Sequence, residues 1–346
     1  MIIQSVTFRT PSRRIDNDEL LGLLREENHD SPSDQVERYC RTVKRLLENI
    51  GAQTRYIRDK VKGERGFDLL IDAVRGCLSN AGLPPSDVDL VIYCGVGRGF
   101  LEPANAAFIT NAIGMKCDNF DINEACMSWV RSLQIAYSLL ATQAYSTVLL
   151  VNAEFTTHEN GLSDVLRLRS HDQIDHTFPA LTIGEAATAT ILTASDRPWR
   201  FRFKSLPRHA TLCTLPLPGF NDFCNPDGRL RLNDAHRFVA FGLEMSRIAV
   251  REMVAFIRQR NEGIEDAKIW FPHNTGETMI QCVAHQVGLS EKLFAGVFRS
   301  YGNLISASIP TALALAAKDG RLSRGDRIVF CVASAGMSLA LIDGVY

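Results

Sequence analysis

Three residues of the chain have the types and positions needed for chemistry on a thioester: Cys126, His273 and Asn303. We expect each of them at the end of a buried strand, in the segments FDINEAC, FPHNTG and RSYGN. A thiolate can take an acyl group from a thioester, and an imidazole and a side-chain amide can donate hydrogen bonds to a second thioester carbonyl as it becomes an enolate. The combination indicates acyl transfer to sulfur followed by a second reaction.

The position of Cys126 separates it from the other cysteines. It begins an apolar segment that continues to about Thr142 and is expected to form a buried helix. The positive end of a helix dipole and its unpaired N–H groups lower the pKa of a thiol, which favours a nucleophile. The alternative is a thiol that only fills the core at a tight turn. The remaining eight, which contain no C-x-x-C pair, are expected to be core residues: Cys40, Cys77, Cys94, Cys117, Cys213, Cys224, Cys282 and Cys331.

His273 directly follows the apolar segment KIWFP, and open α/β sheets bind their ligands at the carboxyl ends of such strands. Taken alone, a histidine there is more often a hydrogen-bonded structural residue. Its combination with a cysteine and an asparagine in comparable positions favours catalysis.

The elements that must position these residues form two similar sets. Continuous apolar segments predict strands covered on both faces, and amphipathic segments predict helices before two of them. At one offset of 177 residues, Asp89 is matched with Asp266 and Cys126 with Asn303. We therefore predict a duplicated α/β fold, in which Cys126 and Asn303 face each other across a pseudo-twofold axis. The first half is residues 1–196 and contains Cys126, and the second half is residues 197–346 and contains His273 and Asn303. Strands are expected at 88–96, 147–155, 268–271 and 327–333, and helices are expected at 69–81 and 241–260.

Composition excludes several classes of function. The formal net charge is −1, which gives no overall attraction to nucleic acid or to an anionic membrane. Residues 1–20 lack the apolar core of a signal peptide, and the densest apolar segment, 329–342, is 14 residues long, short of the roughly 20 that span a bilayer. We expect a cytoplasmic protein without a membrane segment.

Metal and cofactor motifs are missing from the sequence. His171 and His176 lie in a polar segment that we interpret as a solvated loop, and no zinc motif is present. The glycines of 95–99 lack the G-x-G-x-x-G spacing of a dinucleotide site. We therefore expect chemistry without a metal or cofactor. Three irregular segments, 30–62, 158–178 and 216–228, are candidates for lids, channel walls or subunit contacts.

The segments FDINEACMSW, IGEAATATIL, FPHNTG, YGNLISASIPTALALAAKDGRLSRGD and VASAGMSLALIDG resemble the ketoacyl synthase III branch of the thiolase superfamily over nearly the whole chain. The resemblance implies a five-layered αβαβα thiolase-like fold, an intimate homodimer, and acyl-CoA or acyl-carrier-protein thioesters as substrates. It implies that Cys126 is acylated, that His273 and Asn303 assist the second substrate, and that backbone N–H groups of Cys126 and of the Ala335–Gly336 loop bind the oxyanion. It places Arg55 and Arg58 where relatives meet coenzyme A or the carrier's phosphopantetheine.

The sequence departs from the family pattern in three motifs. Gly276 replaces the asparagine that ends the PHQAN motif, which is the family's second asparagine. The GDGAGA and terminal triple-glycine motifs read Gly184–Ala189 and Ser334–Gly336. These changes favour a specialised relative over the initiator of fatty-acid synthesis. The segment 98–104 resembles the LEPA-type loop of the olefin-biosynthesis branch, in which the glutamate, here Glu102, enters the neighbouring protomer's site as a base. The alternative is that Glu102 forms only an ion pair at a dimer edge.

Three hypotheses follow. The first is a condensing enzyme that joins the acyl group on Cys126 to a malonyl-type or second acyl unit. The second is an acyltransferase of the same fold that forms an ester or amide, with His273 as general base. The third is a non-catalytic partner subunit of a heterodimeric synthase, against which the presence of all three residues counts.

Overall fold

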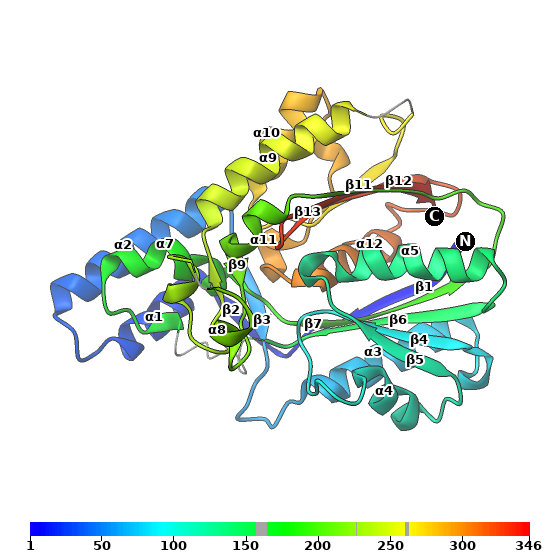
Figure 1. Cartoon of the computed structure of the whole chain (residues 1–346), viewed down its shortest axis with the longest axis horizontal. Coiled ribbons are helices and arrows are strands. Elements are labelled where there is room, and N and C mark those ends of the chain that lie inside the picture. The colour runs from blue at the N-terminus through cyan, green and yellow to red at the C-terminus, as the bar shows by residue number, and fades with distance from the viewer. Residues whose placement is uncertain (157–164, 226, 260–262) are drawn as a thin grey trace.

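The computed structural model describes residues 1–156, 165–225, 227–259 and 263–346, which form two packed sheets with helices between and outside them (Figure 1). The first sheet has the strand order β1-β7-β6-β4-β5, and the second has the order β11-β12-β13-β8. Their strands are β1 (Ile2–Arg9), β4 (Leu90–Cys94), β5 (Asp118–Ile122), β6 (Thr147–Glu154), β7 (Ala186–Thr193), β8 (Arg200–Ser205), β11 (Ile269–Pro272), β12 (Arg327–Ser334) and β13 (Ser338–Val345).

Helices separate and cover the sheets in five layers, α-β-α-β-α (Figure 1). The middle layer contains α5 (Ser128–Ala141) and α12 (Ser308–Lys318). The outer face of the first sheet carries α3 (Gly66–Ala81) and α4 (Asn105–Ile113), and the outer face of the second carries α9 (Gly242–Arg258) and α10 (Glu277–Val287). This is the five-layered arrangement that the sequence predicts.

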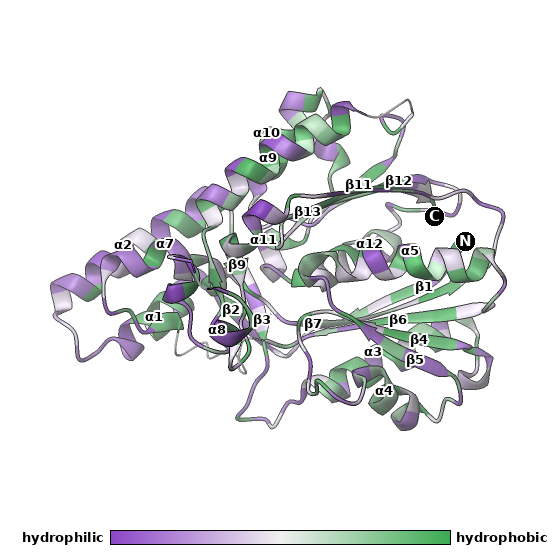
Figure 2. Cartoon of the chain, viewed as in Figure 1, coloured by the Kyte–Doolittle hydropathy of each residue, from purple (hydrophilic) through white to green (hydrophobic). Residues whose placement is uncertain are grey.

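The middle helices are buried because the segments that form them are apolar on nearly every side. Trp129, Val130 and Leu133 of α5, and Ile309, Ala312 and Leu313 of α12, lie in one core cluster with residues of both sheets. Strands β4 and β6 are buried along their whole length, as expected for strands covered on both faces. In Figure 2 these two strands are mostly hydrophobic, whereas the outer helix α2 is largely hydrophilic.

The two sheets repeat one pattern of strand pairing. In the first, β4 pairs in parallel with β6, β6 antiparallel with β7, and β7 antiparallel with β1. In the second, β11 pairs in parallel with β12, β12 antiparallel with β13, and β13 antiparallel with β8. The predicted duplication is therefore confirmed. Along the chain, the last strand of the first sheet ends at Thr193, and the first strand of the second sheet begins at Arg200.

Smaller elements form a side layer next to the two sheets. They are α1 (Asn17–Glu27), α2 (Ser33–Ile50), β2 (Arg13–Asp16), β3 (Thr54–Ile57), α7 (Ile174–Thr177), α8 (Phe220–Phe223), β9 (Cys213–Thr214), β10 (Val239–Ala240) and α11 (Phe298–Tyr301). The irregular segment 30–62 contains α2 and β3, and 216–228 contains α8. Part of the irregular segment 158–178 falls outside the described residues. In the ranges that the structure describes, no helix combines the length and apolar character needed to cross a membrane.

His171 and His176 do not lie in a solvated loop as expected. The His171 ring nitrogen Nε2 lies 2.9 Å from Thr42 Oγ1, and the His176 ring packs against Phe241 with 5.9 Å between ring centroids. Both histidines take part in packing because a 3-10 turn and α7 fold this segment onto α2 and the start of α9.

Candidate active site

Cys126 lies in a 3-10 turn, η2 (Ala125–Met127), that connects the end of β5 to α5. Ala125 has φ 48°, a left-handed conformation that residues other than glycine rarely adopt. Asn123 Oδ1 accepts a hydrogen bond from Ala125 N at 3.3 Å. The strained residue turns the chain sharply, so Cys126 lies two residues before α5 begins at Ser128 and does not belong to the first turn of that helix. We call residues 123–127 the Cys126 turn.

The second half contains the same turn, but its register differs from the one predicted. Ile305 has φ 53° and begins the 3-10 turn η8 (Ile305–Ala307), which is followed by α12 at Ser308. Asn303 Oδ1 accepts from Ile305 N at 2.9 Å, as Asn123 Oδ1 does from Ala125 N. The offset between the halves is therefore 180 residues at this point. Asn303 corresponds to Asn123 and not to Cys126, whose counterpart is Ser306. We call residues 303–307 the Ser306 turn.

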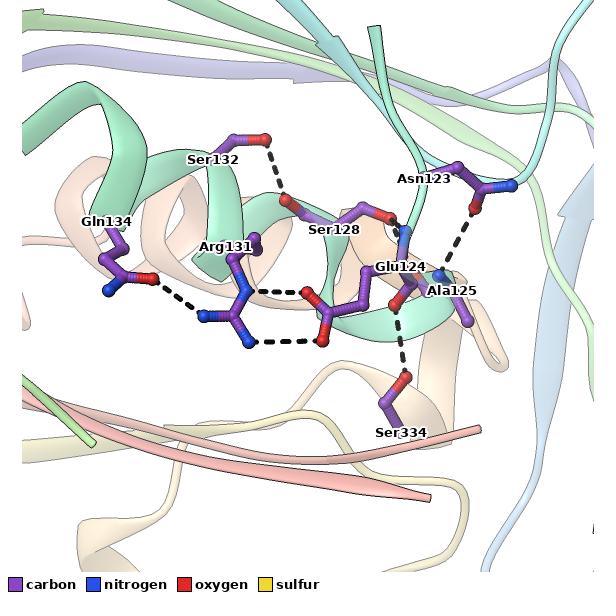
Figure 3. Close-up of polar contacts among 8 residues, drawn as sticks. All are labelled: Asn123, Glu124, Ala125, Ser128, Arg131, Ser132, Gln134 and Ser334. Carbon is purple, nitrogen blue, oxygen red and sulfur yellow. Dashed lines mark hydrogen bonds and ion pairs between the residues drawn. The ribbon is translucent and has the colours of Figure 1, made fainter. Parts of the chain in front are cut away.

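Polar contacts fix the Cys126 turn to the rest of the middle layer (Figure 3). Ser128 Oγ accepts from Glu124 N at 2.8 Å and donates to Ala125 O at 2.7 Å. The Glu124 carboxylate binds Arg131 of α5, with 2.7 Å between Oε2 and Nε. Ser334, at the end of β12, donates from Oγ to Glu124 O at 3.4 Å. These bonds place the end of β12 beside the residue that precedes Ala125.

The electrostatic surroundings of Cys126 contradict the expected lowering of its pKa. Burial raises the pKa of the thiol well above its ordinary value, and Cys213 and Glu154 nearby act in the same direction. The Ser334 hydroxyl acts against them by hydrogen bonding. Desolvation outweighs the favourable backbone groups because the sulfur lies between two sheets. The unacylated site therefore holds a neutral thiol.

His273 directly follows β11, and its N–H donates to Cys331 O of β12 at 2.9 Å. The side chain is 8% exposed, and its Nδ1 lies 3.4 Å from Ser308 Oγ, at the start of α12. Burial lowers the pKa of His273 to about 4, so the imidazole is neutral at physiological pH and can accept a proton.

The departure at Gly276 has a packing explanation. A Cβ atom at this position would lie 3.2 Å from Ile50 Cβ, at the end of α2. Asn274, two residues earlier, is 2% exposed and donates from Nδ2 to Glu277 Oε1 at 3.3 Å. In this chain α2 therefore occupies the space in which a side chain at 276 would begin.

The segments that carry the three predicted residues lie together in the described structure. The Cys126 turn packs against both β12 and the Ser306 turn, and the Ser306 turn contains Asn303. Asn303 N donates to Thr182 O at 2.8 Å, and its own carbonyl accepts from Gly184 N at 3.1 Å, which fixes its backbone. His273 reaches the same region through Ser308. Asn303 Oδ1 accepts the hydrogen bond from Ile305 N within the turn, so Nδ2 is the side-chain group that can donate to a substrate.

The β12–β13 turn contains the two residues predicted to contribute to an oxyanion site, Ala335 and Gly336. Gly336 has φ 112°, which only glycine adopts without strain. Ser334, next to them, is 1% exposed and touches the Cys126 turn. The predicted oxyanion loop therefore directly follows a residue that contacts the Cys126 turn.

Glu102 lies outside this cluster. It is exposed, in a loop between β4 and α4 whose neighbours Phe100 and Leu101 are 48% and 72% exposed. Phe100 stacks on Phe108 with 4.4 Å between ring centroids, and both line a hollow of about 480 Å³. An exposed loop with apolar residues is typical of a surface that is buried in an assembly.

The two arginines predicted to bind substrate differ in burial, since Arg55 is buried and Arg58 is half-buried. Arg58 forms an ion pair with the fully buried Glu185, with 3.1 Å between Nη2 and Oε1, and donates to Phe155 O at 3.0 Å. Arg55 is 2% exposed and donates from Nη2 to Asn17 Oδ1 at 2.8 Å. Burial lowers the pKa of Arg55 to about 10. Arg55 therefore presents no solvated guanidinium to a phosphate, whereas Arg58 is half-buried and lines the same hollow as Phe100 and Phe108.

Sequence reasoning missed three buried polar residues that lie next to the site. Glu154, Asn152 and Ser306 are buried and hydrogen-bonded to one another near the Ser306 turn. A signal was present, because an asparagine and a glutamate end the otherwise apolar strand segment TVLLVNAEF. In the described ranges, no group of three or more His, Cys, Asp or Glu side chains could hold a metal ion.

Two family models match separate segments that together make up half of the chain. Residues 120–206 match 3-oxoacyl-[acyl-carrier-protein (ACP)] synthase III, and residues 257–342 match the C-terminal part of the same enzyme. The chain belongs to the 3-oxoacyl-ACP synthase III family. The matched segments contain Cys126, His273 and Asn303. This membership confirms the general activity expected from the sequence, an acyl-transferring enzyme of the ketoacyl synthase III type.

Relatives of this family extend over most of the chain. A beta-ketoacyl-ACP synthase III of Clostridium perfringens is 26% identical over 312 residues, which are 85% of this chain and 91% of the relative. An acyl-CoA:acyl-CoA alkyltransferase of Xanthomonas campestris is 23% identical over 287 residues, or 81% of this chain and 82% of the relative.

Solved structures confirm the thiolase-like fold. A crystal structure of OleA from Xanthomonas campestris superposes with a TM-score of 0.82 at 18% identity, covering 99% of this chain and 98% of that one. The 3-oxoacyl-ACP synthase III of Aquifex aeolicus gives a TM-score of 0.79 at 21% identity, with 99% of both chains covered.

Proposed function

We propose that the protein is a condensing enzyme that takes an acyl group onto Cys126 and joins it to a second thioester to give a 3-oxoacyl product. The observation that carries the proposal is the convergence of the Cys126 turn, the Ser306 turn with Asn303, and His273 through Ser308. Acyl transfer to a thiol needs only a nucleophile, a base and an oxyanion site, and this cluster supplies all three.

In the first step the Cys126 sulfur attacks the thioester carbonyl while its proton passes to the neutral imidazole of His273. The backbone N–H groups of Cys126 and of the Ala335–Gly336 loop bind the tetrahedral oxyanion. When the tetrahedral intermediate collapses, the bond to the leaving thiolate breaks, and that thiolate takes the proton from His273. The products are an S-acyl Cys126 and a free thiol of coenzyme A or carrier protein.

In the second step a carbanion of the second thioester attacks the acyl carbonyl on Cys126. The carbanion arises by loss of carbon dioxide from a malonyl-type unit or by removal of a proton by Glu102 of a neighbouring protomer. His273 and the Asn303 Nδ2 donor bind the enolate oxygen. The carbon–carbon bond forms as the carbon–sulfur bond breaks, which releases the 3-oxoacyl thioester and leaves Cys126 as a thiolate. That thiolate takes back the proton held by Glu102 or, after decarboxylation, a proton from water, which returns the neutral thiol.

Acyl-CoA is the proposed donor, because OleA of Xanthomonas campestris has been crystallised with bound lauroyl-CoA and a relative is named as an acyl-CoA:acyl-CoA alkyltransferase. The exposed apolar residues of the Glu102 loop support a homodimer in which that loop is covered. We further propose a cytoplasmic location. Acyl carrier protein is the alternative donor, tested by using both.

The test is intact-protein mass spectrometry after incubation with lauroyl-CoA and with lauroyl carrier protein. The expected result is one added lauroyl group that hydroxylamine removes and that Cys126→Ala abolishes. The matched control is Cys282→Ala, since Cys282 is an exposed cysteine far from the turn in sequence, and this variant should be acylated like the wild type. Acylation that persists in Cys126→Ala, or no acylation in any protein, overturns the proposal.

Product analysis separates condensation from ester or amide formation. With an acyl donor and either malonyl-CoA or a second acyl-CoA, Asn303→Ala should retain acylation but lose the 3-oxoacyl product, because the enolate loses a donor. Removing one such donor typically costs ~100-fold in rate. Unchanged turnover in Asn303→Ala counts against carbon–carbon bond formation and favours transfer to an alcohol or amine.

A further inference from the structure

Glu154 is a buried carboxyl group that has no part in the steps above. It is the last residue of β6, its exposed fraction is 0%, and its carboxyl group is held by hydrogen bonds from two directions. From one side, Gly97 N donates to Oε2 at 2.9 Å and Val96 N donates to Oε1 at 3.2 Å. From the other side, both the N–H and the hydroxyl of Ser306 donate to Oε1. Glu154 therefore joins the loop after β4 to the Ser306 turn.

A row of buried side chains supports the contact of Glu154 with Ser306. Asn152 donates from Nδ2 to Ser306 Oγ and to Cys94 O, at 2.9 Å each. Thr188 of β7 donates from Oγ1 to Asn152 Oδ1 at 2.7 Å. Asn152, Thr188 and Glu154 are each 0% exposed. Because unmet hydrogen bonds are costly in such an interior, this row fixes the position of the carboxyl group.

The loop after β4 is pressed against Glu154 at its first residues. A Cβ atom at Gly95 would lie 2.7 Å from Glu154 Oε1, and one at Gly97 would lie 2.3 Å from Ala153 O. Gly95 also has φ 143°. The far end of the loop is fixed separately, since Asn105 Oδ1 accepts from Gly99 N at 2.9 Å. Glu102 lies between these two anchors.

The Ser306 turn connects Glu154 to the nucleophile. Ser306 is the counterpart of Cys126 in the second half, and the two turns pack against each other. One carboxyl group thus contacts the turn opposite the nucleophile of its own protomer and the root of the loop that carries Glu102. It does not contact the reacting atoms through any hydrogen bond of the described residues, so its role is one of positioning.

We propose that Glu154 is a positioning residue that couples the Cys126 site of one protomer to the Glu102 loop that this protomer presents to its partner. The proposal rests on the proposed function, because it takes Glu102 as the base of the neighbouring site. When Glu154 is altered, the root of the loop at Val96 and Gly97 loosens and Glu102 loses its position, while Cys126 retains its own backbone contacts.

Hydrogen exchange tests the anchoring independently of any activity. In Glu154→Gln, the backbone amides of residues 95–104 should exchange about tenfold faster or more. Glutamine has only one acceptor oxygen, and its NH2 group cannot accept the hydrogen bonds that Val96 N and Gly97 N donate to the carboxyl group. The matched control is Glu252→Gln in α9, a carboxyl group 14% exposed and paired with Lys204, which should leave this loop unchanged. Unaltered exchange of 95–104 in Glu154→Gln overturns the proposal.

A double-mutant cycle tests the coupling to Glu102. Glu154→Gln should acylate Cys126 within about threefold of the wild-type rate but condense ten- to hundredfold more slowly, and Glu154→Asp should regain part of that loss. Adding Glu154→Gln to Glu102→Gln should lower the condensation rate by less than about twofold, since both changes remove the same interaction. The coupling is overturned if the two variants lower the condensation rate additively, or if Glu154→Gln slows acylation as much as condensation. It is also overturned if Glu102→Gln condenses at the wild-type rate.

Two further measurements keep the outcomes distinct. Should Glu154→Gln fail to fold, Ser306→Ala removes one donor to the carboxyl group and is expected to give the same pattern with smaller amplitude; normal exchange and turnover in that variant overturn the proposal. A wild-type protein that acylates no cysteine refutes the proposed function and the coupling together. Faster exchange of 95–104 in Glu154→Gln then still shows that Glu154 anchors the loop.

Discussion

His273 is buried and Cys126 is half-buried, and the loss of solvent around each disfavours its charged form. A resting thiolate–imidazolium pair would place two charges between the sheets. The neutral pair avoids that cost and requires the proton to move only as the thioester is attacked. At the scale of single residues, the site is therefore activated by its substrate and not by a preformed ion.

The neutral thiol predicts slow alkylation. At pH 8, iodoacetamide should modify Cys126 more slowly than the exposed Cys282, because only the thiolate reacts and burial raises the pKa of Cys126. Peptide mapping of a time course measures both rates in one sample. Faster labelling of Cys126 than of Cys282 would show that the helix dipole outweighs desolvation.

The low pKa of His273 predicts an acid-sensitive stability. An unfolded histidine binds a proton near pH 6.5, whereas folded His273 does so only near pH 4, so the unfolded state is favoured as the pH falls between these values. Above pH 6.5 this residue adds no pH dependence. The full effect is about 3 kcal/mol, from 1.36 kcal/mol for each pKa unit.

Urea unfolding at pH 7.5 and 4.5 measures this effect. The wild type should lose more stability between the two pH values than His273→Gln does. His29→Gln, at an exposed histidine after α1, should behave like the wild type. Equal losses in the wild type and His273→Gln would contradict the prediction.

At the scale of elements, the site is built from two copies of one strained turn. Ala125 and Ile305 hold left-handed conformations at the same point before their helices, and each is fixed by an asparagine two residues earlier. A left-handed residue other than glycine costs roughly 1 kcal/mol or more. The packing of the two turns against each other maintains this conformation.

The strain predicts an unusual response to glycine. Ala125→Gly should change the free energy of unfolding by less than about 0.5 kcal/mol or raise it, because glycine adopts the required φ without penalty. The control is Ala112→Gly at an exposed position of α4, which should cost about 1 kcal/mol. Thermal and urea unfolding give both values. Equal destabilisation would mean that Ala125 is not strained in solution.

The sequence allowed the elements to be predicted better than the register between them. The segment 147–155 predicts β6 because its apolar residues are continuous, and the segment after Cys126 predicts α5 for the same reason. The match of Cys126 with Asn303 was wrong, because it aligned apolar segments and could not detect the left-handed residues that set the turns. Glu154 was missed because its partners come from distant parts of the chain.

At the scale of the whole molecule, the two halves share one interior. Helices α5 and α12 lie side by side between the sheets and contribute to a single core cluster with strands of both halves. Neither half can expose its middle helix without opening the other. We therefore expect the protein to unfold as one cooperative unit despite its duplicated architecture.

This expectation is tested with Leu313→Ala in α12, a residue that is 0% exposed. The substitution should lower the free energy of unfolding by about 3 kcal/mol and move one single transition. Tryptophan fluorescence and far-UV circular dichroism should report the same midpoint. Two separated transitions in either protein would indicate that the halves unfold independently.

The contact between Gly276 and Ile50 restricts the order in which this chain can change. An asparagine introduced at 276 begins 3.2 Å from the Ile50 Cβ atom, so it arrives in occupied space. Because every residue except glycine carries a Cβ atom, a shorter side chain at 50 leaves this contact in place, and α2 itself must move by a few tenths of an ångström before an asparagine fits at 276. The residue type at 276 is therefore tied to the position of α2 and not to the size of the side chain at 50.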